Sequence, residues 1–243
     1  MSYKSVFRRY ELKYLLTPEQ HSAVLSGIEP YMKLDSYGRT VIRNVYYDTD
    51  SFRLIRRSIE KPKYKEKIRI RSYQRADSDT PVFVELKKKY DGVVYKRRIS
   101  LPESVATDWL CDRISTPCDT QISREIDYFK SFYGSLRPTM FLSYEREAYY
   151  ERAGGDFRIT FDDNILCRRT DVSLQQEPCG YSILPPDRVL MEIKCAGAIP
   201  LWMVKILSEW GIYKTSFSKY GTAYAKTVLN QHTYEQKEIK SNA

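Results

Sequence analysis

Lysine and arginine recur at every second position in several short runs of the sequence. In KEKIRIRSY, Lys67, Arg69 and Arg71 alternate with Ile68 and Ile70. Alternate side chains of a strand lie on opposite faces, so such a run predicts a strand with one basic face and one apolar face. Several basic faces brought together would bind a polyanion such as a phosphate chain, because guanidinium and ammonium groups form strong hydrogen bonds with phosphate oxygens.

Other runs repeat this pattern with a mixed or basic polar face. For any single run, a sheet face exposed to water is the alternative explanation. However, like charges on neighbouring strands destabilise a sheet. The apolar faces of the strands must also be covered by other elements. We therefore expect the sheet to enclose its charged faces and the helices to pack on its apolar outer face. The runs are RRYELKYLL (Glu11, Lys13), VFVELKKKY (Glu85, Lys87), VVYKRRISL (Lys96, Arg98), MFLSYEREAYY (Tyr144, Arg146), DFRITFDDN (Arg158) and VLMEIKCA (Glu192, Lys194).

Helix signals lie between these runs. Thr17 followed by Pro18 and, three residues on, Gln20 predicts a capped helix that extends to about Tyr31. Further helices are expected to begin near Pro102, Ser123, Pro200 and Ser218. The pattern predicts an α+β fold: a closed antiparallel barrel of about eight strands with a charged interior, helices outside and a C-terminal helix at its wall. We expect one domain over residues 1–230 and a polar tail over 231–243.

The composition narrows the classes of function. A net charge of +9 indicates an anionic partner but does not choose among nucleic acid, membrane surface and phosphorylated molecules. The 2 histidines and 5 scattered cysteines, without CxxC spacing, disfavour histidine-based catalysis, a disulfide framework and a zinc site. No apolar run approaches the roughly 20 residues of a membrane span. With no signal-peptide pattern at the N-terminus, we expect a cytoplasmic protein.

Isolated glutamates on the basic faces indicate that the ligand is a phosphate compound with a bound metal ion and not a nucleic acid. Glu11, Glu85 and Glu192 each precede a lysine by two residues. A nucleic-acid surface gains nothing from central carboxylates, whereas Mg²⁺ or Mn²⁺ binds one or two carboxylates and completes its shell with phosphate oxygens and water. We therefore expect triphosphate or polyphosphate as ligand, a divalent metal as cofactor, and no nucleic-acid partner. An ion pair with the neighbouring lysine is the alternative role of each glutamate.

Taken in order, nine segments resemble the VTC domain of polyphosphate polymerases, a group within the triphosphate tunnel metalloenzymes, to which the CYTH proteins are related. The segments are RYELKYLL, YYDTDSF, KIRIRSY, FVELKKK, YKRRISL, LRPTMFLSYEREAYY, RITFDDN, VLMEIK and FSKYGTAYA, and the likeness covers residues 3–230. The resemblance implies an eight-stranded tunnel in which the γ-phosphate of ATP passes to a growing polyphosphate chain and ADP is released.

The resemblance also implies roles for individual residues. Glu192 matches the metal-binding glutamate, and Glu11 is a second candidate metal ligand. Because the chain has Arg9 where the wider superfamily opens with a glutamate, the metal depends mainly on Glu192. The implied catalytic residues are Arg69, Arg71, Arg146, Arg158 and Lys219. The implied phosphate-binding residues are Lys13, Lys87, Lys96, Tyr144, Lys194 and Ser218.

Three other functions remain open at the level of the sequence. Water in place of the polyphosphate acceptor would make the protein a triphosphatase. A module that binds polyphosphate without turnover needs the same basic residues, and a nucleic-acid binder would also use Lys, Arg and Tyr. Eukaryotic proteins of this kind carry membrane domains, so membrane coupling of this chain would require a partner protein. Oligomeric state is left open.

Overall fold

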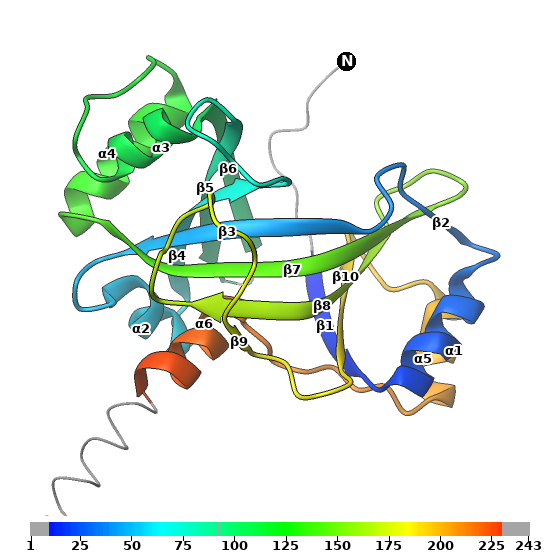
Figure 1. The fold of residues 1–243 in the computed structure, drawn as a ribbon. Helices are drawn as coiled ribbons and strands as arrows, with labels where there is room; N and C mark the ends of the chain where they lie inside the picture. The colour runs from blue at the N-terminus through cyan, green and yellow to red at the C-terminus, as the bar shows by residue number, and fades with distance from the viewer. Residues whose placement is uncertain (1–9, 92, 230–243) are drawn as a thin grey trace, which may run out of the picture.

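One large antiparallel sheet is the centre of the computed structural model, which describes residues 10–91 and 93–229 (Figure 1). The sheet has 10 strands, ordered β1-β10-β8-β7-β3-β4-β5-β6, with β2 beside β7 and β9 beside β8. The strands are β1 (Tyr10–Leu16), β2 (Met32–Leu34), β3 (Thr40–Asp48), β4 (Tyr64–Ser72), β5 (Pro81–Tyr90), β6 (Val93–Pro102), β7 (Arg137–Glu151), β8 (Arg158–Arg168), β9 (Tyr181–Ser182) and β10 (Val189–Cys195).

Helices complete the α+β architecture. They are α1 (Pro18–Ile28), α2 (Arg53–Ile59), α3 (Glu103–Leu110), α4 (Gln121–Tyr133), α5 (Leu201–Glu209) and α6 (Lys219–Tyr224), which continues as a π-helical turn η1 (Ala225–Leu229). In the described ranges, no helix is both long enough and apolar enough to cross a bilayer. The predicted tail over residues 231–243 lies outside the described residues.

Two groups of helices cover the apolar outer face of the sheet at opposite ends (Figure 1). α3 and α4 pack over β4, β5 and β6, where Ile68, Ile70 and Leu86 are buried against Trp109. α1 and α5 pack over β1, β8 and β10. Burial of each such side chain contributes about 1.5–3 kcal/mol. The apolar members of the alternating runs therefore lie under helices, and the predicted division into apolar outside and charged inside is confirmed.

The opposite, inner face of the sheet carries the alternating charged residues and is partly covered by α6. Tyr220 of α6 stacks on Tyr46 of β3, with ring centroids 4.4 Å apart and planes at 15°. Tyr224 belongs to the same apolar cluster as Leu142 of β7. α6 and η1 therefore cover one part of the inner face with apolar and aromatic side chains. The charged residues of the inner face lie beside this covered part.

The predicted closure of eight strands into a barrel was wrong. Among the described residues, β1 and β6 end the strand order, and no ladder joins them. The free edge of β1 is covered by the chain that leads into α6: the Thr215 amide donates to the Lys13 carbonyl at 2.7 Å, and Tyr14 bridges Lys214. These contacts therefore cover the middle of the free β1 edge, one way in which a protein protects an edge strand.

The helix predictions were correct where caps are encoded locally. Thr17 and Gln20 form the predicted capping box of α1. α4 begins at Gln121, ahead of the predicted Ser123, because Thr120 is the N-cap and Ser123 completes its capping box. α2 was not predicted, since its cap comes from outside the helix.

Asp48, at the end of β3, supplies that cap. Its carboxylate accepts from the amides of Leu54 at 2.9 Å and Ile55 at 3.0 Å. β3 itself was also missed, because both of its faces are buried and no polar alternation marks it.

Candidate functional site

Glu192 of β10 is the centre of the first charged cluster on the inner face. Its carboxylate lies 2.9 Å from Lys219 Nζ, 3.4 Å from Lys13 Nζ, and 3.6 Å from both Lys194 Nζ and the Arg146 guanidinium. Burial alone would raise the pKa of Glu192, but these cations hold it well below its usual range. Glu192 is therefore ionised and is reached by side chains from β1, β7, β10 and α6.

Asp162 of β8 is a second buried carboxylate beside Glu192, with 0% of its surface exposed. Arg146 Nη2 donates to it at 2.6 Å, and Lys219 Nζ also binds it. Although burial opposes the charge, Arg146 and Lys219 lower the pKa of Asp162. Asp162 was not predicted as a site residue, although it follows Arg158 and Thr160 at alternate positions and therefore shares their face of the strand.

Glu85 of β5 is the centre of the second cluster. Its carboxylate lies 2.6 Å from Lys96 Nζ, 2.8 Å from the guanidinium groups of Arg69 and Arg98, and 3.8 Å from Arg71. Burial would raise the pKa of Glu85, but Arg69, Arg71 and Lys96 lower it strongly. Glu85 is therefore occupied by ion pairs within the sheet, but its partners are Arg69, Lys96 and Arg98 and not the neighbouring Lys87, which pairs with Glu11.

Polar groups of β3 and β7 orient the two arginines of β4. Arg69 Nη1 donates to the Tyr46 hydroxyl at 2.8 Å. Arg71 donates to Asn44 Oδ1 and to the Tyr144 hydroxyl, both at 3.0 Å. Because β3 was not predicted, sequence reasoning missed Asn44 and Tyr46. The hydrogen bonds fix both guanidinium groups on the inner face.

Lys67, two residues before Arg69, is a cation of the site that no carboxylate in the described part of the chain compensates directly. Its Nζ donates to Ser218 Oγ at 3.1 Å, and it has no ion-pair partner among the described residues. Burial, with Lys13 and Lys87 nearby, lowers the pKa of Lys67 to about 7. The sequence showed Lys67 on the basic face but did not single it out.

Burial lowers the pKa values of other lysines on this face as well, including Lys13. Burial lowers the pKa of Lys194 to about 7 against the attraction of Glu192. Burial likewise lowers the pKa of Lys96 to about 8 against Glu85. Cations held close together and away from water lose protons easily, and a bound anion would restore their charge.

Glu11 and Arg158 form no ion pair or hydrogen bond with Glu192 or Glu85 among the described residues. Glu11 pairs with Lys87 of β5 at 2.8 Å, and although burial acts in the other direction, Lys87 and Lys194 lower the pKa of Glu11 to about 2. Arg158 stacks over the Tyr150 ring at 4.5 Å, and its buried Nε has no hydrogen-bond partner in the part of the chain that the structure describes. Arg158 therefore holds a buried donor that no described residue satisfies.

Ser218 is the N-cap of α6. Its Oγ accepts from the Gly221 amide at 3.1 Å as well as from Lys67. Through this cap, Ser218 places the first residue of α6, Lys219, opposite Glu192 and Asp162. In the ligand-free structure Ser218 thus supports the helix and Lys67.

Taken together, the inner face holds many more cations than carboxylates. Two like charges 4 Å apart repel by about 4 kcal/mol at an effective dielectric near 20, so the excess favours a bound anion. The cations are Lys13, Lys67, Arg69, Arg71, Lys87, Lys96, Arg98, Arg146, Arg158, Lys194 and Lys219, and the carboxylates are Glu11, Glu85, Asp162 and Glu192. Every site residue predicted from the sequence belongs to this face or caps the helix against it.

The donor set fits a metal ion that arrives with phosphate. Within the described ranges, no group of three or more His, Cys, Asp or Glu side chains could hold a metal alone. Glu192 is an ionised carboxylate on the inner face, and Glu11 is near enough to influence it electrostatically. Since Mg²⁺ and Mn²⁺ take one or two carboxylates and fill the remaining positions with phosphate oxygens and water, these residues suffice when phosphate is present.

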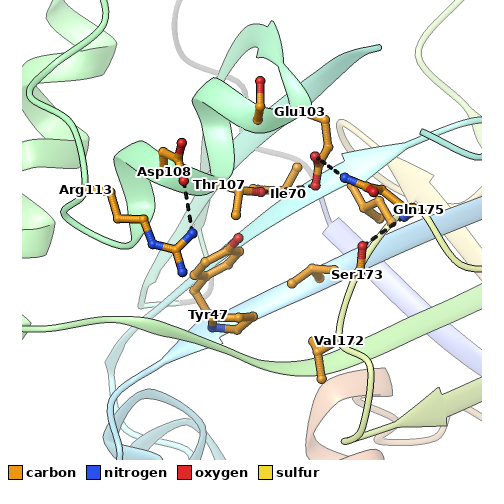
Figure 2. Close-up of a pocket in the computed structure, with 13 residues that line it drawn as sticks. Tyr47, Ile70, Glu103, Thr107, Asp108, Arg113, Val172, Ser173 and Gln175 are labelled. Atoms are coloured by element: carbon orange, nitrogen blue, oxygen red, sulfur yellow. Dashed lines mark hydrogen bonds and ion pairs between the residues drawn. The ribbon is translucent and has the colours of Figure 1, made fainter. Parts of the chain in front are cut away.

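A pocket of about 270 Å³ lies on the outer face instead, between the sheet, α3 and the chain after β8 (Figure 2). Tyr47 and Ile70 belong to its lining, as does Glu103, which already accepts from Thr107 and Gln175. Because Ile70 alternates with Arg69 and Arg71 along β4, this pocket opens on the side of the sheet opposite the charged clusters. We place the candidate site on the inner face.

Comparison with known proteins agrees with this architecture. The sequence profile of the VTC domain matches residues 8–228, so the chain belongs to the VTC domain family. No curated protein matches the chain in a sequence search. The resemblance expected from the sequence is therefore confirmed at the level of the family.

Two solved structures share the fold. An adenylate cyclase candidate from Bacillus halodurans has a TM-score of 0.52 at 15% identity, covering 87% of this chain and 95% of that one. A Hippeastrum adenylyl cyclase candidate, described as having a dominant triphosphatase activity, has a TM-score of 0.51 at 15% identity, covering 90% and 97%. At this identity the likeness establishes the fold and does not transfer an activity.

Proposed function

We propose that this chain is a polyphosphate polymerase that transfers the γ-phosphoryl group of ATP to the end of an inorganic polyphosphate chain and releases ADP. The observation that carries the proposal is the excess of cations over carboxylates on the inner face, contributed by strands from both halves of the sheet. A compact polyanion is the ligand class that such a surface stabilises.

The arginines would bind the oxygens of the triphosphate. Arg69 and Arg71 are oriented by hydrogen bonds with β3 and β7, and Arg146 is held by Asp162. Their planar donors suit phosphate oxygens, and each charge-assisted hydrogen bond contributes about 1.5–3 kcal/mol. Arg158 would add a further guanidinium from β8. The fixed geometry aligns the phosphates and reduces the entropy lost in reaching the transition state.

The lysines extend the site along the phosphate chain. Lys13, Lys194 and Lys219 surround Glu192, whereas Lys87 and Lys96 lie on β5 and β6 across the inner face. Together they would provide positive charge along both halves of the inner face for the growing polymer. Tyr144 and Ser218 support this set by holding Arg71 and Lys67.

Glu192, with Glu11 as a second carboxylate, would hold the divalent metal. A bound Mg²⁺ or Mn²⁺ supplies neutralisation of the negative charge that develops on the transferred phosphoryl group. Lys219 remains charged because Asp162 and Glu192 raise its pKa, although burial opposes this. It can therefore donate to a phosphate oxygen throughout the reaction.

Phosphoryl transfer needs no general base in this scheme. A terminal oxygen of polyphosphate, already anionic, forms a bond to the γ-phosphorus. The bond between that phosphorus and the β–γ bridging oxygen breaks, and its electron pair leaves with ADP. Positioning and charge neutralisation supply most of the catalysis of such reactions, which agrees with a site made of Arg, Lys and carboxylates.

A triphosphatase is the second candidate, favoured by the triphosphatase activity described for the Hippeastrum protein of similar fold. The same residues would bind the triphosphate, and water would replace the polyphosphate acceptor. Incubation with ATP and Mn²⁺, followed by separation of products by length on a gel, distinguishes the two. A ladder of long polyphosphate supports the polymerase, release of free phosphate alone supports the triphosphatase, and unchanged ATP supports a module that binds without turnover.

A further inference from the structure

An aromatic group adjoins the Glu85 cluster at one end of β4, β5 and β6. Tyr73, the residue after β4, packs edge-on against Phe83 of β5, with ring centroids 5.9 Å apart at 73°. Arg98 of β6 joins the two rings: its Nη2 donates to the Tyr73 hydroxyl at 2.8 Å, and its guanidinium carbon lies 4.0 Å from the Phe83 centroid. The three side chains thus form one aromatic and cationic surface, which we call the Tyr73 platform.

The Tyr73 platform is accessible, unlike the tyrosines deeper on the inner face. Tyr73 is 46% exposed, whereas Tyr46 and Tyr144 are 6% and 2% exposed and each accepts a hydrogen bond from an arginine. The Arg98 side chain is 35% exposed. Ring and guanidinium surface is therefore available to a planar ligand.

The platform is continuous with the residues assigned to the triphosphate. Arg98 Nε donates to Glu85 Oε1 at 2.9 Å, and the other oxygen of Glu85 accepts from Arg69. On the other side, Tyr73 is near Arg158. Burial lowers the pKa of Arg158, whereas the nearby Tyr73 acts to raise it. A ligand held by Arg69 and Arg158 would have the Tyr73 platform at its end.

We propose that the Tyr73 platform is a stacking site for the base of a nucleoside triphosphate whose phosphates lie on the inner face. This inference rests on the proposed function and adds to it the recognition of the nucleoside. Nucleobases stack on aromatic rings and on arginine, whatever their edge groups. The donors of Arg98 that approach the platform are already bound to Glu85 and Tyr73. The site should therefore favour purines over smaller pyrimidines without distinguishing ATP from GTP.

Calorimetry with two ligands tests this subsite without turnover. The β,γ-imido analogue of ATP carries a base, and inorganic tripolyphosphate does not. Tyr73→Leu should weaken the nucleotide analogue about tenfold, the size of one stacked base, and change tripolyphosphate less than about twofold. Tyr73→Phe keeps the ring and should bind both ligands nearly as the unaltered protein does. Tyr128→Leu, on the exposed surface of α4, is the matched control and should change neither.

The outcomes separate this subsite from the proposed function. Equal weakening of both ligands by Tyr73→Leu, or no weakening of the nucleotide analogue, would overturn the stacking site and leave the phosphate site intact. A marked loss of nucleotide binding in Tyr73→Phe would also overturn it, because the hydroxyl and not the ring would then be responsible. If the unaltered protein bound neither ligand, the phosphate site and the stacking site would both be wrong.

Discussion

Lys219 Nζ lies 2.9 Å from Glu192 Oε1 and also binds Asp162, so one ammonium group compensates two buried carboxylates on neighbouring strands. Because Lys219 is the first residue of α6, this contact attaches the C-terminal helix to β8 and β10. The same helix carries Tyr220, whose hydroxyl donates to Asp48 at 3.0 Å. The charged site and the position of α6 are therefore linked.

Replacement of Lys219 should be strongly destabilising. In Lys219→Met, Glu192 and Asp162 lose their shared cation, and removal of one partner of a buried ion pair costs about 3–5 kcal/mol. Urea unfolding of the ligand-free protein measures the effect. Lys205→Met removes a lysine from an exposed pair with Glu209 and should change the free energy of unfolding by less than about 0.5 kcal/mol. Similar stability of the two variants would contradict the role given to Lys219.

Replacement of Glu192 should separate turnover from phosphate binding. Glu192→Gln removes the charge that would hold the metal, so Mn²⁺-dependent turnover of ATP should fall at least about a hundredfold. Tripolyphosphate should bind as tightly as before or more tightly, because Lys13, Lys194 and Arg146 lose a competing carboxylate. Steady-state kinetics and calorimetry measure the two effects.

Glu209→Gln, on the exposed end of α5, is the control for this experiment and should behave as the unaltered protein. Full activity of Glu192→Gln would show that the metal is not bound at this carboxylate.

The affinity for polyphosphate should fall as the pH rises from 6 to 9. Lys67 and Lys194 have pKa values of about 7 in the ligand-free protein, so both are protonated at pH 6 and largely neutral at pH 9. Binding then requires proton uptake, which calorimetry in buffers of different ionisation enthalpy detects. The loss of one charge-assisted hydrogen bond should weaken binding about tenfold or more. Lys67→Arg should reduce the dependence on pH, and an affinity independent of pH would contradict these assignments.

The stability of the ligand-free protein should depend on pH in the opposite sense. Unfolded Lys67 has an ordinary pKa near 10.5, whereas burial lowers the pKa to about 7 in the folded protein. Between these values the unfolded chain binds more protons, so the contribution of Lys67 to the free energy of unfolding rises with pH. Lys67→Met should therefore be stabilising at pH 7 and should flatten this rise. Denaturant unfolding from pH 7 to 10 checks it, and a steeper rise in the variant would contradict it.

The inner face was predictable because its pattern depends on local geometry. Lys67, Arg69 and Arg71 share a face in any strand, whatever lies around them, and the same holds for Glu192 and Lys194. The cap of α1 at Thr17 is equally local. These features require no knowledge of which strands are neighbours.

The rest depends on contacts between distant parts of the chain. β3 has no alternation because both of its faces are buried, so Asn44 and Tyr46 were missed as partners of Arg71 and Arg69. The edge of β1 is covered by the backbone of Thr215, which no side-chain pattern records. Whether β1 and β6 pair depends on such contacts between distant segments, so the open sheet was not predictable from local patterns.

The balance of products formed from ATP tests the proposed polymerase most directly. ATP labelled at the γ-phosphate is incubated with the protein and Mn²⁺, and ADP, free phosphate and acid-insoluble polymer are measured together. A polymerase puts one labelled phosphate into the polymer for each ADP released, with little free phosphate, and Glu192→Gln abolishes this. ADP matched by free phosphate, with no labelled polymer, would contradict the account.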